Sequence, residues 1–220
     1  MRASGGHGRS ADTDADAASE TDPGTVARRF SEASALLARG ACFALAALGE
    51  VTADLLARPT PCEGWDLRAL LWHLDDSVAA LTDALTSGYV GLPETSEPGG
   101  EEPAAADAGD PLAAVRCRLA RLVDLRGDAA HVRIGDRCLG HADLAVAGAL
   151  ELTVHGWDVG RTTGARHPVP AGLALRLLRH APRLVPREVR GTLFAPPVPV
   201  PDATDPGDLL VAYLGRDPAR

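Results

Sequence analysis

The stretch that most constrains this 220-residue chain is an almost entirely apolar run, 142–150, that leads directly into the polar pair Glu151 and His155. Asp143 is the only charged residue in that run, which predicts a buried helix. Residues four apart lie one turn above the other on the same face of a helix. A carboxylate and an imidazole in a buried helix need hydrogen-bonding partners or a metal ion. A Glu–His pair with this spacing is also common on the surface of helices. The metal interpretation therefore requires a third ligand elsewhere in the chain.

The best candidate for that ligand is His73, a single imidazole in the apolar segment Leu70-Leu71-Trp72-His73-Leu74. Together, His73, Glu151 and His155 would provide two histidines and one carboxylate with an open fourth position. This arrangement is typical of a catalytic zinc-like site rather than a structural one. A core histidine that donates to a backbone carbonyl is the alternative for His73.

Composition and periodicity predict an all-α protein. Ala and Leu are abundant and aromatic residues make up only 4% of the chain, which favours helices over sheets. Apolar residues recur at threes and fours in five segments, two of them preceded by a capping Asp66 or Asp110. The predicted helices are Thr25–Leu48, Asp66–Ser87, Leu112–Leu125, His141–Thr163 and Ala171–Ala181. We therefore expect a four-helix bundle with its polar site in the core, and a shorter fifth helix beside it.

The segments between and outside these helices have other compositions. Residues 1–22 are polar and aperiodic, so we expect a disordered leader, and 23–220 should form a single domain. The Pro- and Gly-rich stretch 88–109 predicts a long mobile connection, and 130–139 predicts a small β-turn or hairpin. Prolines from Pro182 onward predict that the fifth helix ends there and that 182–220 is an extended tail packing on the bundle.

Charge and hydropathy restrict the possible partners. The net charge of −8 argues against a nucleic-acid surface. Because no run is long and apolar enough for a membrane span or a signal peptide, we expect no membrane association and a cytoplasmic protein. The four cysteines show no paired spacing and are interpreted as mostly buried thiols. Cys62 differs because it lies in the loop before the His73 helix, where a structural role is weighed against a reactive one.

Other polar and aromatic residues near the two motifs have two interpretations each. Asp158 could accept a hydrogen bond from a ligand imidazole, or it could form a salt bridge with Arg161. Trp65 and Trp157 could line a cofactor pocket or pack in the core, and Arg161 could bind an anionic group or face solvent. The remaining histidines have no ligand-like spacing and are expected at the surface or at helix caps; they include His131, His141, His167 and His180.

Two separated motifs resemble a known superfamily. The segment 60–74, with Thr60-Pro61, Gly64-Trp65 and His73-Leu74, resembles the signature of the DinB/YfiT-like superfamily. Glu151-Leu-Thr-Val-His155-Gly-Trp157-Asp158 resembles the corresponding motif of its mycothiol-dependent maleylpyruvate isomerase branch. The segment 194–218 is similar to the tail of actinobacterial metal-binding members of that branch, although no larger C-terminal substrate-binding domain is recognised.

The resemblance implies a divalent metal, most often Zn²⁺ with Ni²⁺ or Mn²⁺ as alternatives, held by His73, Glu151 and His155. It also implies mycothiol as a thiol cosubstrate and an electrophilic small molecule as the other partner. The expected activity is a metal-dependent thiol S-transferase or isomerase, in a monomer or homodimer. A metal-dependent hydrolase, a Lewis-acid enzyme of secondary metabolism and a non-catalytic metal- or ligand-binding bundle remain as alternatives.

Overall fold

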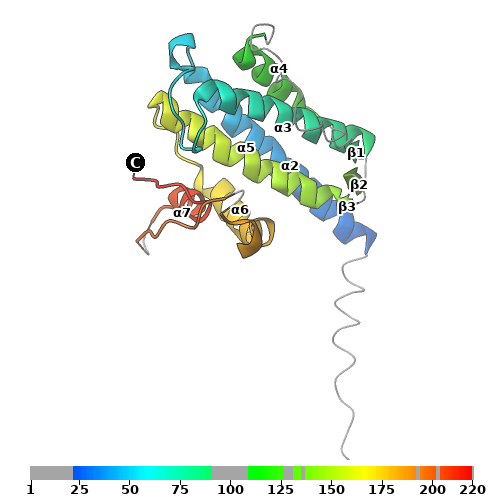
Figure 1. Cartoon of the computed structure of the whole chain (residues 1–220). Coiled ribbons are helices and arrows are strands. Elements are labelled where there is room, and N and C mark those ends of the chain that lie inside the picture. Colours follow the sequence, from blue (N-terminus) through cyan, green and yellow to red (C-terminus); the bar gives the residue numbers. More distant parts are fainter. Residues whose placement is uncertain are drawn as a thin grey trace, which may run out of the picture.

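The computed structural model describes residues 22–90, 109–125, 131–134, 137–191, 194–201 and 204–219. In these residues the protein is an all-α bundle, which confirms the predicted fold class. Figure 1 shows α2, α3 and α5 running side by side, α4 against α3, and α6 and α7 together near the C-terminus. The bundle helices are α2 (Pro23–Ala47), α3 (Leu67–Ser87), α4 (Pro111–Val123) and α5 (His141–Thr163). The predicted leader lies outside the described residues, except for Asp22.

Aspartate side chains define where three of these helices begin. Asp22 accepts a hydrogen bond from the Thr25 amide at 3.1 Å, and Asp66 accepts one from the Ala69 amide at 2.8 Å. Asp110 caps α4 in the same way through Leu112 at 3.0 Å. Each carboxylate satisfies an amide that has no partner inside its own helix. The predicted starts of α3 and α4 are therefore confirmed to within a residue or two.

Small residues let α5 approach α2 closely. A Cβ added at Gly156 would lie 2.9 Å from Ala44 Cα, and one added at Gly40 would lie 2.9 Å from the Ala149 carbonyl oxygen. Residues 152–160 of α5 are all buried. Because one face of α5 rests on α2, its Glu151 and His155 side chains are directed toward α3 and the loop before it.

One described helix is long and apolar enough to cross a membrane by length and composition alone. This is the segment Gly24–Glu50, which comprises α2 and the 3₁₀ turn Leu48–Glu50. Half of its most apolar window is buried inside the protein, and α2 packs along α5. A core helix passes the same test, so this feature is explained by packing in the bundle.

A small sheet closes one end of the bundle. Strand β2 (His131–Ile134) pairs antiparallel with β3 (Arg137–Gly140), which confirms the predicted hairpin. Strand β1 (Tyr89–Val90) pairs parallel with β2 and was not predicted, because two residues leave no alternating pattern. It occupies the start of the predicted connection 88–109, whose residues 91–108 lie outside those described.

Two predictions about the C-terminal part were wrong. Helix α6 (Ala171–Leu184) continues past Pro182, whose exposed ring points away from the core, and the Val185 amide bonds to the Ala181 carbonyl at 2.8 Å. The tail beyond it is not wholly extended, because it contains the 3₁₀ turn Arg187–Val189 and the helix α7 (Pro206–Tyr213). Asp205 caps α7, and the apolar residues of this helix are buried against the rest of the protein. The segment 194–201 has no helix, as predicted.

The cysteines also differ from the prediction of mostly buried thiols. Cys42 and Cys117 are exposed, and Cys62 is half-buried. Cys42 and Cys117 lie on the outer faces of α2 and α4, beside the buried apolar stripe of each helix. The side chain of Cys138 lies outside the described part of the structure.

Candidate metal centre

Helices α3 and α5 bring together the three side chains predicted as metal ligands. His73 Nε2 lies 2.7 Å from Glu151 Oε1, and His155 Nε2 lies 3.3 Å from the same oxygen. The two imidazole rings meet nearly edge-on, with their centroids 4.9 Å apart. One ligand atom from each residue lies within 4.8 Å of the others, so the group could hold a metal ion. The triangle joins residues that are 78 positions apart in the chain.

The cluster is buried on one side and open on the other. The side chains of His73 and Glu151 are 34% and 28% exposed, whereas that of His155 is 9% exposed. Ser77, one turn after His73, donates a hydrogen bond to Glu151 Oε1 at 3.3 Å. Solvent therefore reaches the cluster from the side of His73 and Glu151, while His155 anchors it in the protein.

The loop before α3 forms one wall of this opening. Thr60 bonds through both its amide and its hydroxyl to the Trp65 carbonyl, each at 3.0 Å, and its hydroxyl accepts from the Cys62 amide at 3.1 Å. Gly64 takes φ +80° inside this turn, a conformation that favours glycine. The closed turn holds the Trp65 ring 4.7 Å from the His73 ring, beside the open side of the cluster, and the Trp65 side chain is exposed.

Hydrogen bonds control the charge state of the cluster. Burial alone would raise the pKa of Glu151, but hydrogen bonds with His155 and His73 outweigh it and hold this pKa well below its usual range. Burial would likewise lower the pKa of His155, yet hydrogen bonds with Asp158, Cys62 and Glu151 raise it well above its usual value. Glu151 is therefore a carboxylate at neutral pH, as a metal ligand must be.

Asp158 lies behind His155 and is held there by a residue that sequence reasoning missed. Asp158 Oδ2 lies 3.0 Å from His155 Nδ1 and 3.0 Å from Arg216 Nη2, and the carboxylate is fully buried. Burial tends to raise the pKa of Asp158, but the bond with His155 and the Arg216 charge lower it. The alternative salt bridge of Asp158 with Arg161 is wrong, because Arg216 takes that place. The Gly-Arg216-Asp217-Pro218 segment of the family-like tail was the signal that could have identified it.

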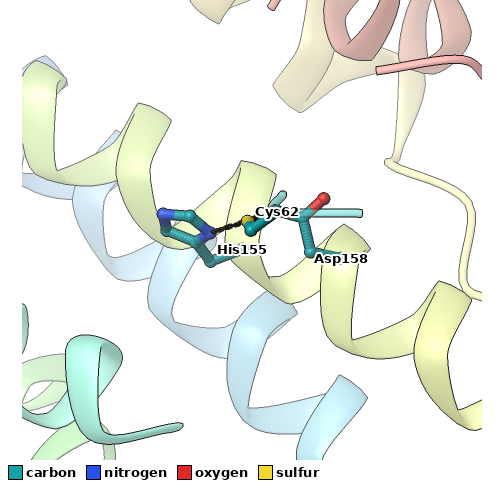
Figure 2. A group of neighbouring side chains, drawn as sticks. All are labelled: Cys62, His155 and Asp158. Atoms are coloured by element: carbon teal, nitrogen blue, oxygen red, sulfur yellow. Dashed lines mark hydrogen bonds and ion pairs between the residues drawn. The ribbon is translucent and has the colours of Figure 1, made fainter. Parts of the chain in front are cut away.

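Cys62, in the loop before α3, lies with Asp158 and Arg216 behind His155 and completes the group behind His155 (Figure 2). Its Sγ lies 3.7 Å from His155 Nδ1, 3.2 Å from Asp158 Oδ2 and 3.5 Å from Arg216 Nη2. The predicted loop cysteine therefore reaches the ring nitrogen of His155 that faces away from Glu151. Its position in the loop indicated proximity, but not these contacts.

Trp157 and Arg161, predicted to bind a cofactor, lie apart from the ligand cluster. Trp157 is 6% exposed, and the Arg161 guanidinium carbon lies 5.5 Å from the centroid of its ring. Both residues line two surface cavities of about 560 and 390 Å³, which include none of the three predicted ligands. The smaller cavity is also lined by Arg216, so it adjoins the group behind His155.

The other histidines are only partly as expected. His141 lies at the start of α5, as the helix-cap alternative allows, but it is 3% exposed with its ring 4.0 Å from that of Phe30, so it is not at the surface. It begins α5, where the chain turns inward from β3. His167 is half-buried and its Nε2 lies 2.9 Å from the Phe43 carbonyl oxygen, and His180 is half-buried. The side chain of His131 is outside the described residues.

Fold and site together define a class: an all-α bundle in which facing helices carry two histidines and one carboxylate around a partly open position. The donor set suits zinc and similar divalent ions, and Asp158 behind His155 is the usual partner of a metal-bound imidazole. Residues 37–160 match the family model described as the mycothiol maleylpyruvate isomerase N-terminal domain. The match covers more than half of the chain, so the protein belongs to this mycothiol-related family. No curated protein and no solved structure shows a significant match.

Proposed function

We propose that this protein is a metal-dependent enzyme that activates mycothiol, a low-molecular-weight thiol, toward an electrophilic small molecule. The outcome is either transfer of the thiol to that molecule or its thiol-assisted isomerisation. The observation that carries the proposal is the convergence of His73, Glu151 and His155 on one partly open position, in a member of a mycothiol-related family. We further propose that the ion is Zn²⁺ and that the protein works in the cytoplasm.

The donor set supports both the ion and the thiol. Two neutral imidazoles and one carboxylate would leave a divalent ion with a formal charge of +1 and an open position. A bound ion of this kind lowers the pKa of a coordinated thiol and keeps it as the nucleophilic thiolate near neutral pH. An anionic fourth ligand is therefore favoured over a neutral one on charge alone.

The surrounding residues prepare the ligands for this task. Asp158 would accept a hydrogen bond from the N–H at His155 Nδ1, which leaves the Nε2 lone pair to face Glu151 and His73. Arg216 holds Asp158 through two bonds of 3.0 and 3.3 Å, so the carboxylate keeps one orientation. Ser77 donates to Glu151 and leaves the carboxylate's other lone pairs available.

Access to the cluster supports a bulky thiol as the cosubstrate. The exposed edges of His73 and Glu151 lie beside Trp65, which is 36% exposed and presents an apolar wall to an incoming molecule. A small molecule can therefore approach from solvent without unfolding any helix. The acidic net charge of −8 agrees with small-molecule partners rather than nucleic acid.

Conjugate formation tests the proposal directly. Zinc-loaded protein is incubated with mycothiol and a panel of electrophiles, and the products are identified by mass spectrometry. Conjugate or isomerised product should form with the wild type and with Glu188→Gln, an exposed surface control, but not with Glu151→Gln. Hydrolysis products without loss of thiol would favour the hydrolase alternative, and no turnover of any electrophile by zinc-loaded wild type would overturn the proposal.

A further inference from the structure

The imidazole of His155 has polar groups on both of its nitrogens. Nε2 faces Glu151 and His73, whereas Nδ1 faces Cys62 and Asp158 on the opposite side of the ring. Figure 2 shows the sulfur of Cys62 directed at this second nitrogen. We propose that Cys62, His155 and Asp158 form a second cation site, selective for soft, thiophilic ions such as Cd²⁺ or Cu⁺.

The spacing of the three donor atoms fits a tetrahedral ion. With the bond lengths of tetrahedral Zn²⁺, about 2.3 Å to sulfur and about 2.0–2.2 Å to nitrogen or oxygen, the donors lie roughly 3.3–3.6 Å apart, and a larger soft ion needs somewhat more. The distances here are 3.2 Å from Sγ to Oδ2, 3.7 Å from Sγ to Nδ1 and 3.0 Å from Nδ1 to Oδ2. Shifts of a few tenths of an ångström in side chains would complete the triangle.

A positive group already lies beside two of the three donors. Arg216 Nη2 is 3.0 Å from Asp158 Oδ2 and 3.5 Å from Cys62 Sγ, and the Arg216 side chain is 12% exposed. The guanidinium therefore neutralises the Asp158 carboxylate, which is what a cation bound at the second site would also do. Arg216 follows Gly215, which takes φ +85° after α7, so its side chain is carried by a turn rather than by a helix. Its departure toward solvent would leave the thiolate and carboxylate for the ion.

The donors determine which ions compete successfully. A thiolate and an imidazole bind soft ions far better than Mg²⁺ or Ca²⁺, which require several oxygen ligands. Binding releases the Cys62 thiol proton to solvent and requires His155 to carry its proton on Nε2, which leaves the Nδ1 lone pair for the ion. A neutral imidazole offers a lone pair on only one nitrogen, so an ion at Nδ1 competes with an ion at Nε2. Ion binding at the second site should therefore weaken ion binding at the first, because both sites use His155.

The test isolates Cys62 spectroscopically. In a background where Cys42, Cys117 and Cys138 are replaced by Ser, metal-free protein is titrated with Cd²⁺ and the ultraviolet thiolate-to-cadmium charge-transfer absorbance is recorded. The band should saturate at about one ion per chain through the Cys62 thiolate. It should be absent when Cys62→Ser is added to that background. No band in the parent background would overturn the proposal.

Two further variants separate this site from the first one. Glu151→Gln should abolish thiol conjugation yet keep the cadmium band, so failure of either proposal is distinguishable from failure of the other. Arg216→Met should raise the affinity for Cd²⁺ by about tenfold or more, because it removes the competing charge. Arg121→Met, an exposed arginine of α4, is the matched control and should leave the affinity unchanged. A lost band in Glu151→Gln, or no gain in Arg216→Met, would contradict the second site.

Discussion

Replacement of Asp158 by Asn tests how the buried carboxylate supports the metal centre. The carboxylate contacts His155, Arg216 and Cys62 and is fully buried, so its charge is balanced inside the protein. Loss of the partner of a metal-bound imidazole weakens metal affinity by about 10- to 100-fold, which corresponds to ~1.4–2.7 kcal/mol. Removing one member of a buried ion pair should also lower the free energy of unfolding by about 3 kcal/mol.

Both effects can be measured on the same samples. Zinc affinity is obtained by competition with a chromophoric chelator, and Tm is obtained by calorimetry of the metal-free protein. The loss of stability should lower Tm by roughly 6–12 °C in a chain of this size. Asp143→Asn is the matched control on the same helix, because Asp143 is 42% exposed and pairs with Arg183 at the surface. It should change stability by less than about 0.5 kcal/mol. If Asp158→Asn behaves like Asp143→Asn in both assays, the reasoning is refuted.

Three further predictions concern packing and metal binding. Gly156→Ala should lower the free energy of unfolding by about 1–2 kcal/mol net, because the added Cβ would lie 2.9 Å from Ala44 Cα and this clash outweighs the helix propensity of Ala. Gly172→Ala is the control: its Cβ meets only the flexible tip of an arginine, so chemical denaturation should show unchanged or higher stability. Arg118→Met should cost about 2 kcal/mol, because it removes the 2.7 Å partner of buried Asp75; an unchanged denaturation midpoint would contradict this. Zinc at about 100 times its Kd should stabilise the protein by ~2.7 kcal/mol and raise Tm by roughly 5–11 °C, and a chelator should reverse the shift.

The ligand triad could be selected from the sequence because each member breaks an apolar helical pattern. Glu151 and His155 are polar in a helix whose following residues are buried, and His73 lies between the buried Leu71 and Leu74. Helix starts were equally readable, because a capping aspartate acts on amides two or three residues away. These signals relate residues that are close together in the chain, so they can be recognised in a single sequence.

Asp158 could be predicted behind His155 because it lies three residues further along the same helix. Cys62 and Arg216 could not be placed there from the residues themselves, because their contacts are long-range and only the family resemblance of the tail pointed to Arg216. Cys62 is 96 residues from Asp158, and Arg216 is 58 residues from it. No periodicity relates a loop cysteine, a helical aspartate and an arginine beyond the last helix. Helix α7 was missed for a related reason, since a short helix in a proline-rich stretch has too few turns to show a pattern. Its N-cap Asp205 and the following Pro206 were the available signals.

The most direct test of the metal centre is the zinc stoichiometry of ligand variants, measured by elemental analysis and calorimetric titration. We would use a Cys62→Ser background, so that the second site cannot contribute. The parent should bind about one zinc per chain through its three ligands, as should His180→Asn, a half-buried histidine of α6 outside the ligand cluster. His73→Asn, Glu151→Gln and His155→Asn should each lose that ion while remaining folded. Undiminished zinc binding in all three variants, or no binding by the parent, would contradict the assignment.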